Sequence, residues 1–319
     1  MILVTGSNGL LGQAVIKRLH SESKIVRGSV REPIQSLMDE IVYVPVGAID
    51  KSTDWSTALL GIRTVVHTAA RVHVMHDKST NALDEFRVVN VDGTINLARQ
   101  AVKSGVKRFI YISSIKVNGE YTIAAQPFTE ADIPLPADPY GVSKLEAEAA
   151  LYTLSEETEM EVVCIRPPLV YGVGVKANFF KMMEWLYKGT PLPFGAIDNK
   201  RSLVGLDNLV DLIITCIEHP SASNQTFLVS DGEDLSTSEL LYRVARALNK
   251  KPFLLPVDQK ILEFSLKLIG KKDLSQRLCS SLQVDISKAK ALLSWTPPVS
   301  LDEGLRKTAE NFLSLNINE

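Results

Sequence analysis

The chain has 319 residues, of which 45% are apolar, and this is enough for a sizeable buried core with a smaller second lobe. Charged residues make up 23% and the formal net charge is −2, which argues against an electrostatic nucleic-acid binder. The apolar run at the N-terminus is too short for a secretory signal or a membrane span, and the three cysteines form no C-x-x-C pair. We therefore expect a cytoplasmic protein with no membrane partner, no disulfide framework and no zinc site.

Short β-branched runs alternate with longer helical patterns through the first half of the chain. The runs that predict buried strands are 2–5, 24–29, 41–46, 64–68, 109–113 and 162–166. The patterns that predict helices include 10–20, 84–104 and 140–157. This alternation is typical of the α/β class, and it predicts a Rossmann-type doubly wound parallel sheet with helices on both faces.

Beyond residue 166 the alternation is interrupted by prolines and glycines, and 188–201 is expected to be a loop. A helix at 207–218 and a strand at 226–229 are expected to return to the main sheet. The patterns 237–249, 258–269, 285–293 and 301–313 predict helices of a smaller, mixed and mostly helical C-terminal lobe. We therefore predict a Rossmann domain over 1–172 with return elements near 203–230, and a second lobe formed by 173–202 and 231–319.

A glycine-rich turn follows the first predicted strand and opens a helix. Glycine in such a turn lets the backbone approach a pyrophosphate, whose charge then meets the helix N-terminus. A turn without a ligand is the alternative, but this strand-turn-helix position favours a dinucleotide. The residues expected at the cofactor are Gly6, Asn8, Gly9, Leu10, Leu11 and Gly12.

The end of the second predicted strand bears on which dinucleotide is bound. NAD-binding chains usually carry an acidic residue there that bonds the ribose 2′-hydroxyl, but no carboxylate appears here before Glu32. Arg31, with Ser29 or Arg27, could instead pair with a 2′-phosphate through charge-assisted hydrogen bonds of about 1.5–3 kcal/mol each. Solvated arginines are the alternative. We predict NAD(P)(H), leaning to NADP(H).

A second motif places a phenol and an amine on one face of a helix. Tyr140 and Lys144 are four residues apart, and Asp138 resembles an N-terminal cap. A phenol has an ordinary pKa near 10, and a neighbouring ammonium would lower that pKa towards the range useful for proton transfer. Ser114 ends the preceding predicted strand, where ligand chemistry gathers in parallel sheets, so it could hydrogen-bond the same substrate oxygen.

Together these motifs resemble the extended short-chain dehydrogenase/reductase family, in particular its nucleotide-sugar 4-epimerase and 4-ketoreductase branch. The likeness covers nearly the whole chain and includes His67-Thr68-Ala69-Ala70, Asn90-Val91-Asp92-Gly93-Thr94, Arg166-Pro167, Val170-Tyr171-Gly172 and Trp295-Thr296-Pro297. It implies that 1–172 holds NAD or NADP and that the second lobe holds a nucleotide diphosphate. The implied catalytic group is Ser114, Tyr140 and Lys144. The further implied cofactor contacts are Ile49, Thr68, Ala69, Ala70, Asn90 and Pro167, besides Tyr140 and Lys144.

The resemblance also assigns the substrate side of the site. The residues that it places there, besides Ser114, are Asn178, Leu192, Pro193, Arg201 and Arg277. The two arginines match diphosphate-binding positions, with solvated surface residues as the alternative. Ala48 stands where family members often carry an adenine-contacting aspartate, which argues against permanent NAD binding.

The residues after Ser114 narrow the expected reaction. Family dehydratases and decarboxylases carry acids there and the 3,5-epimerising branch a cysteine, whereas this chain has Ile115 and Lys116. What remains is hydride and proton transfer at C4 of a UDP-linked hexose or N-acetylhexose. We lean to a 4-keto-sugar reductase of surface polysaccharide synthesis. The alternatives are a UDP-glucose or UDP-N-acetylglucosamine 4-epimerase with retained NAD, and a non-catalytic cofactor-sensing protein.

Two further expectations concern assembly and metal binding. In family members the helices that correspond to 84–104 and 140–157 form a dimer bundle, so we expect a homodimer, although core packing explains the same apolar pattern. His73 and His76 lie near Asp77, but no third spaced ligand accompanies them. We therefore expect no metal, and a substrate or surface loop at this segment.

Overall fold

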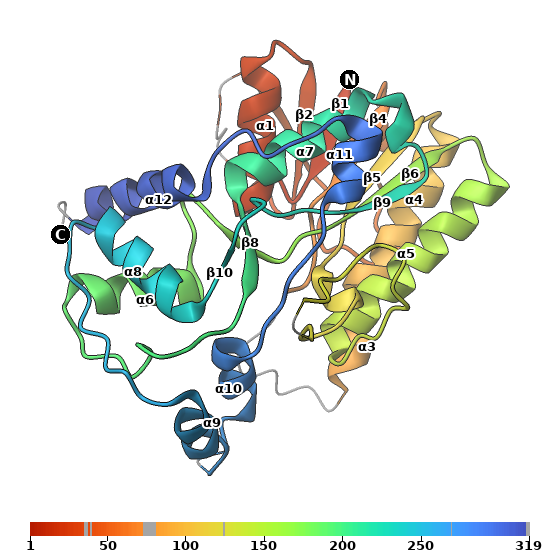
Figure 1. Cartoon of the computed structure of the whole chain (residues 1–319). Coiled ribbons are helices and arrows are strands. Elements are labelled where there is room, and N and C mark those ends of the chain that lie inside the picture. The colour runs from red at the N-terminus through yellow and green to blue at the C-terminus, as the bar shows by residue number, and fades with distance from the viewer. Residues whose placement is uncertain (35–37, 39, 73–80, 124, 269, 317–319) are drawn as a thin grey trace.

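A sheet of seven parallel strands lies at the centre of the fold, in the order β3-β2-β1-β4-β5-β6-β9 (Figure 1). The strands are β1 (Ile2–Thr5), β2 (Val26–Val30), β3 (Val42–Pro45), β4 (Thr64–His67), β5 (Arg108–Ile112), β6 (Glu161–Arg166) and β9 (Gln225–Leu228). The order reverses between β1 and β4, and ligands bind such sheets at the carboxyl ends of the strands beside the reversal. The predicted Rossmann-type sheet is confirmed. The computed structural model describes residues 1–34, 38, 40–72, 81–123, 125–268 and 270–316.

Helices cover both faces of this sheet because successive side chains of each strand point to opposite sides. Val4 of β1 packs in one core cluster with Ile16, whereas its neighbour Leu3 packs in the other with Leu97 and Ala147. The helices on the first face are α1 (Leu10–Ser21) and α7 (Leu206–Glu218). Those on the second are α2 (Ser56–Leu59), α4 (Thr94–Lys103) and α5 (Pro139–Glu157).

The long helix expected over 84–104 is interrupted by a π-helical turn. It consists of α3 (Ala82–Arg87), the π-helical η1 (Val88–Gly93) and α4. Such turns are frequent at functional sites. Here the turn contains the buried Asn90. After β5, a short 3-10 turn η2 (Ile115–Val117) leads away from the sheet.

A second sheet in the order β10-β8-β7 packs with helices of the C-terminal lobe, although β7 and most of β8 lie in the ranges predicted for the Rossmann domain. Its strands are β7 (Leu169–Tyr171), β8 (Arg201–Gly205) and β10 (Asp234–Leu235). The helices α6 (Ala177–Tyr187), α8 (Thr237–Ala247) and α12 (Leu301–Asn316) share one core cluster beside it. A pair formed by α9 (Gln259–Leu268) and α10 (Lys272–Cys279) projects from the lobe, and α11 (Ser287–Leu293) lies against β9 (Figure 1). Sequence patterns did not predict β7, β8, α6 or α10.

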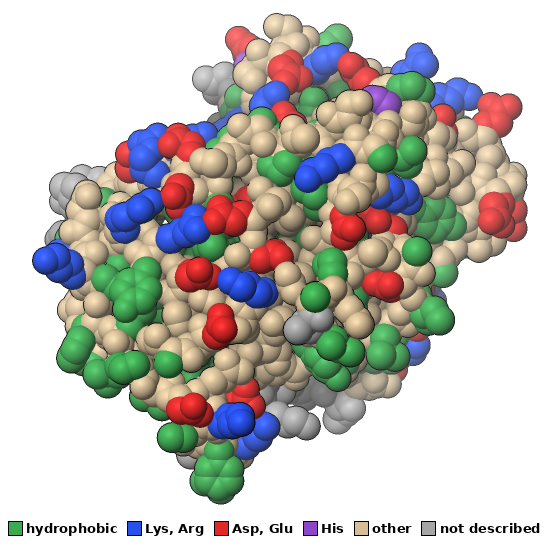
Figure 2. Space-filling view, viewed as in Figure 1, with side chains coloured by type: hydrophobic (Ala, Val, Ile, Leu, Met, Phe, Trp, Pro, Cys, Tyr) green, Lys and Arg blue, Asp and Glu red, His purple; other side chains and the backbone are tan. Residues whose placement is uncertain are grey.

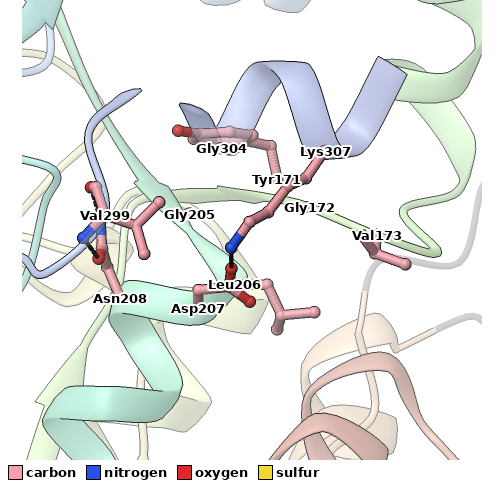
Figure 3. Close-up of a pocket in the computed structure, with 10 residues that line it drawn as sticks. All are labelled: Tyr171, Gly172, Val173, Gly205, Leu206, Asp207, Asn208, Val299, Gly304 and Lys307. Atoms are coloured by element: carbon pink, nitrogen blue, oxygen red, sulfur yellow. Dashed lines mark hydrogen bonds and ion pairs between the residues drawn. The ribbon is translucent and has the colours of Figure 1, made fainter. Parts of the chain in front are cut away.

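A small cavity marks where the two lobes are joined (Figure 3). Tyr171 donates a 2.7 Å hydrogen bond to the Asp231 carboxylate, and Lys307 of α12 pairs with Asp207 of α7 at 2.7 Å. Asn208 donates to the Val299 carbonyl at 2.8 Å and accepts from its amide at 2.9 Å. The cavity measures about 10 Å³, which is room for one water molecule. We therefore assign it to the packing between lobes.

The surface carries charges of both signs. On the face shown in Figure 2, lysine and arginine side chains are interspersed with aspartate and glutamate side chains. Within the part of the chain that the structure describes, no helix is both long and apolar enough to cross a lipid bilayer.

Candidate active site

The glycine-rich turn packs tightly between β1, β4 and α1. Gly6 adopts φ +63°, and a Cβ there would lie 2.9 Å from the backbone nitrogen of Ala69. A Cβ on Gly12 would lie 2.3 Å from the Gly6 carbonyl oxygen. Gly9 is the N-cap of α1 and provides no side-chain cap, so the amides of the first helical turn are available to an anion. These features fit the pyrophosphate of a dinucleotide.

The remaining predicted cofactor residues line the same edge of the sheet. Thr68, Ala69 and Ala70 follow β4, and the Thr68 hydroxyl donates to the Thr5 carbonyl at 2.6 Å. Pro167 follows β6, and its carbonyl accepts a 3.0 Å hydrogen bond from the turn after Ser114. The half-buried Ile49 packs against Gly93 of η1, where an added Cβ would lie 2.5 Å from the Ile49 side chain. Asn8, Leu10 and Leu11 lie at the start of α1.

Of the three residues considered for a 2′-phosphate, Arg27 and Ser29 lie within β2 and Arg31 follows it, and the three differ in accessibility. The Arg27 guanidinium donates to the Thr57, Ala58 and Leu60 carbonyls at 3.1, 2.9 and 2.9 Å. It therefore holds the end of α2, and the suggested role for Arg27 is wrong. Ser29 is buried, with 2% of its surface exposed. Arg31 is exposed at the end of the strand and remains the predicted contact.

The side chains of Ser114, Tyr140 and Lys144 come together where β5 ends and α5 begins. The Ser114 hydroxyl interacts with Tyr140 by hydrogen bonding. The Lys144 ammonium donates a 2.8 Å hydrogen bond to the Ile112 carbonyl. It lies 4.5 Å from the ring centre of Tyr111 and 5.8 Å from that of Tyr140. A hydroxyl, a phenol and an amine are thus gathered in an arrangement that can move a proton to or from an alcohol.

The pKa of the Tyr140 phenol shifts in the direction opposite to the one expected. Burial, followed by the negative charge of Asp138, raises the pKa of Tyr140 to about 12, although the hydrogen bond with Ser114 opposes this rise. Burial lowers the pKa of Lys144 to about 7. The predicted lowering of the phenol pKa by Lys144 is therefore wrong for the chain on its own. The reason is the desolvation of the phenol, which is the largest cause of the rise in its pKa.

Asn90 connects the loop after β4 to the first turn of α5. Its side-chain oxygen accepts from the Arg71 amide at 2.8 Å, and its nitrogen donates to the Arg71 carbonyl and the Ser143 hydroxyl, both at 3.0 Å. The Ser143 hydroxyl in turn donates to the Tyr140 carbonyl at 2.8 Å. In this chain Asn90 therefore orients the backbone at the site, and its cofactor contact stays a prediction.

A buried ion pair that involves Glu148, one helical turn after Lys144, was not predicted from the sequence. Arg166 of β6 donates to the Glu148 carboxylate at 3.0 Å and to the Asn118 side chain at 2.9 Å. The Arg166 and Glu148 side chains are only 7% and 3% exposed. The negative charge of Glu148 raises the pKa of Lys144, although burial has the larger, opposite effect. The four-residue spacing could have shown that Lys144 and Glu148 share one face of a helix, but no spacing indicated Arg166.

A buried histidine at the end of β4 also lies close to this centre. The His67 ring lies 2.7 Å from the Thr5 hydroxyl through Nδ1 and 3.0 Å from the Thr94 hydroxyl through Nε2. Burial and the charge of Lys144 lower the pKa of His67 to about 3. It is therefore neutral at physiological pH, and it links β1 to α4.

The two predicted diphosphate arginines lie near each other. Burial lowers the pKa of Arg201, the charge of Glu120 opposes this shift and the charge of Arg277 adds to it. Arg201 lies at the start of β8 and donates to the Ser280 carbonyl at 2.9 Å. Arg201 therefore lies within electrostatic range of Arg277, in the same lobe, and of Glu120, which follows η2.

The other predicted substrate residues are less closely gathered. Asn178 is exposed in the first turn of α6. Leu192 is buried, and its backbone bonds the Phe253 carbonyl at 2.9 Å and the Leu255 amide at 2.8 Å. Pro193 beside it is half-buried. Their contacts with a substrate stay predictions.

Metal ligands were expected to be absent. The segment with His73, His76 and Asp77 lies outside the described residues. Among the residues that are described, no group of three or more histidine, cysteine or acidic side chains could hold a metal ion.

The chain is similar to a known protein family and to several known proteins. The family model for the NAD dependent epimerase/dehydratase family matches residues 2–230. A UDP-glucose 4-epimerase of Vibrio cholerae is 51% identical over 317 residues, which are 99% of this chain and 96% of that protein. The solved UDP-glucuronic acid 4-epimerase of Bacillus cereus, in complex with NAD, is similar with a TM-score of 0.79 and 21% identity. The match covers 98% of this chain and 99% of that chain. The solved UDP-glucose 4-epimerase of Thermotoga maritima with UDP-glucose has a TM-score of 0.77 and 24% identity, and covers 99% of both chains.

The fold and the gathered Ser114, Tyr140 and Lys144 define the short-chain dehydrogenase/reductase class of dinucleotide enzymes. Within that class, the chain belongs to the NAD dependent epimerase/dehydratase family. This confirms the resemblance to the nucleotide-sugar branch that the sequence motifs indicated.

Proposed function

We propose that the chain is a UDP-hexose 4-epimerase, which oxidises C4 of the sugar and returns the hydride to the opposite face with NAD that stays bound. The observation that carries this proposal is the similarity, over almost the whole length, to the Vibrio cholerae UDP-glucose 4-epimerase. It favours the 4-epimerase alternative over the 4-ketoreductase to which the sequence motifs leaned. The substrates proposed are UDP-glucose and UDP-N-acetylglucosamine and their C4 epimers.

The proposed roles follow from the geometry of the three side chains. Tyr140 takes the proton of the C4 hydroxyl during oxidation and gives it back during reduction. Ser114, which hydrogen-bonds Tyr140, also bonds the C4 oxygen and keeps it beside the phenol. Lys144, on the same face of α5, stabilises the phenolate when it is charged. When bound, the nicotinamide supplies the hydride acceptor.

We propose that the dinucleotide cofactor and the nucleotide sugar bind to different parts of the chain. The uncapped start of α1 and the turn from Gly6 to Gly12 support a pyrophosphate there. Arg201 and Arg277 support a diphosphate in the lobe of 173–202 and 231–319. We propose NAD as the cofactor, and Arg31 keeps NADP as the alternative. A cytoplasmic homodimer that serves polysaccharide synthesis completes the proposal.

The test is to incubate the purified protein with UDP-glucose, or with UDP-N-acetylglucosamine, and no added cofactor. We expect interconversion of the C4 epimers to equilibrium, because a retained NAD is regenerated in every cycle. Chromatography of the UDP-sugars measures it, and heat-denatured protein is the control. A protein that leaves both sugars unchanged, but oxidises NADPH when a UDP-4-keto-sugar is supplied, would show that the reductase reading is right.

A further inference from the structure

A half-buried lysine connects the turn that carries Ser114 to the start of the helix that carries Tyr140. The Lys116 amide donates a 3.3 Å hydrogen bond to the Ser114 hydroxyl. The Lys116 ammonium forms one ion pair with Asp138 and another, at 3.1 Å, with Glu120. Its side chain is 26% exposed and that of Asp138 20%, so solvent screens this pair less than a fully exposed one.

Asp138 acts both on the helix and on the phenol. It caps α5 by accepting a 2.7 Å hydrogen bond from the Gly141 amide. Its negative charge is also the largest electrostatic cause, after burial, that raises the pKa of Tyr140. Burial, Asp138 and Ser114 are the causes that act on this pKa. The Lys116 ammonium contacts Asp138, so its charge reaches the phenol most directly through that carboxylate.

We propose that Lys116 is a positioning residue for the reaction, which holds and neutralises Asp138 and so controls the pH at which Tyr140 exchanges its proton. This inference rests on the proposed function, because it assigns Tyr140 as the proton-transfer group.

Other charged or titratable groups surround Tyr140 from several elements. Phe86 of α3 packs edge-on against the Tyr140 ring at 5.9 Å, and the Arg71 guanidinium lies 5.8 Å from the Phe86 ring. The groups to be considered besides Lys116 and Asp138 are Lys144 of α5, Tyr111 of β5, Glu120 after η2, and the Arg71–Glu85 ion pair, whose N–O distance is 3.6 Å. All of these stay unchanged in the variants proposed below, so they do not contribute to differences between them.

The experiment compares Lys116→Gln with Lys116→Arg, Asp138→Asn and the double variant Lys116→Gln/Asp138→Asn. Asparagine is as good an N-cap as aspartate, so Asp138→Asn removes the charge and keeps the cap. Lys107→Gln is the matched control, since Lys107 pairs with Glu159 at 3.1 Å on an exposed surface. Two readouts are taken: the pH profile of kcat/KM for 4-epimerisation, and the carbon-13 NMR titration of the Tyr140 phenol with NAD added, assigned with Tyr140→Phe.

We expect Lys116→Gln to move the acid limb of the profile, and the Tyr140 titration, upward by about 0.5–1 pH unit, because Asp138 is left unneutralised. Lys116→Arg and Lys107→Gln should match the wild type. Asp138→Asn should move both readouts downward, and adding Lys116→Gln to it should cause little further shift. This lack of additivity distinguishes action through Asp138 from a direct effect.

The proposal is overturned if Lys116→Gln lowers kcat equally at every pH without moving the limb, which is the mark of a purely structural role. It is also overturned if the Tyr140 signal behaves identically in the wild type and in Lys116→Gln. The NMR readout needs no sugar turnover. If no variant, and not the wild type either, interconverts the sugars, the proposed function fails while the titration still decides the role of Lys116.

Discussion

Replacement of Tyr140 by phenylalanine is expected to lower kcat for 4-epimerisation by about 10²–10⁴-fold, which is the usual contribution of a positioned general acid–base. The substitution removes one hydroxyl and leaves the ring, which packs edge-on against Phe86 at 5.9 Å. The fold and the affinity for NAD should therefore change little. Ser114 should not take over, because its neutral hydroxyl is a far weaker base than a phenolate.

The measurement is steady-state kinetics with both UDP-sugars, together with NAD binding by isothermal titration calorimetry. Tyr121→Phe is the matched control, since Tyr121 is 61% exposed and lies outside the catalytic group. It should keep wild-type activity. A Tyr140→Phe protein that retains activity within a few fold, while binding NAD normally, would remove the phenol from the mechanism and revive the cofactor-sensing alternative.

Replacement of Lys144 by methionine is expected to act in opposite directions on activity and on stability. Activity should fall by about 10²-fold or more, because the phenolate loses its cation. The free energy of unfolding at neutral pH should rise by about 2–4 kcal/mol, because methionine fills a similar volume without the cost of burying an amine. The loss of the 2.8 Å hydrogen bond to the Ile112 carbonyl reduces this gain but does not reverse it.

The pH dependence of stability gives this prediction its sign. The pKa of Lys144 is about 7 in the folded chain, below the ordinary value of 10.5. Between these two values the unfolded chain binds more protons than the folded chain, so the wild type gains stability as pH rises from about 7 to about 10. Lys144→Met should lack this gain. Urea unfolding across that pH window measures it, with the exposed Lys107→Met as control. A variant that is less stable than wild type at neutral pH would contradict the assignment.

The parts of the fold that could be predicted are those governed by local periodicity. The buried β-branched runs and the glycine turn after β1 define the parallel sheet, since each depends on residues close together in the chain. The second sheet could not be predicted in the same way. Its strand β7 has three residues and β10 has two, and both pair only because β8 lies between them. Runs this short carry no period to recognise.

The candidate site also has one part that local spacing predicts and one part that depends on tertiary contacts. Tyr140 and Lys144 were recognisable because their four-residue spacing forces them onto one face of a helix. Some of the groups that act on their pKa values come from other elements, as Ser114 does for Tyr140 and Cys164 of β6 for Lys144, and single-sequence spacing gives no such pairing. The direction of the shift in the Tyr140 pKa was missed for this reason, because burial is a tertiary property and is the largest cause of the rise.

The choice between reductase and epimerase rested on the end of β2, where no acid precedes Glu32. That absence bears on the ribose contact alone. It does not determine whether the cofactor leaves between the two hydride transfers, which depends on the whole binding surface. The family and the similarity to the Vibrio cholerae 4-epimerase therefore outweigh it.

A 4-epimerase returns the hydride to the sugar molecule from which it came. This feature distinguishes it from the 4-ketoreductase and from a cofactor-sensing protein. The return of the hydride can be followed in a mixture of UDP-glucose with deuterium at C4 and uniformly carbon-13 UDP-glucose with protium at C4. We predict UDP-galactose in which deuterium stays on carbon-12 molecules, as mass spectrometry would detect. Deuterium on carbon-13 product or in released NADH, or the absence of any UDP-galactose, would contradict the account.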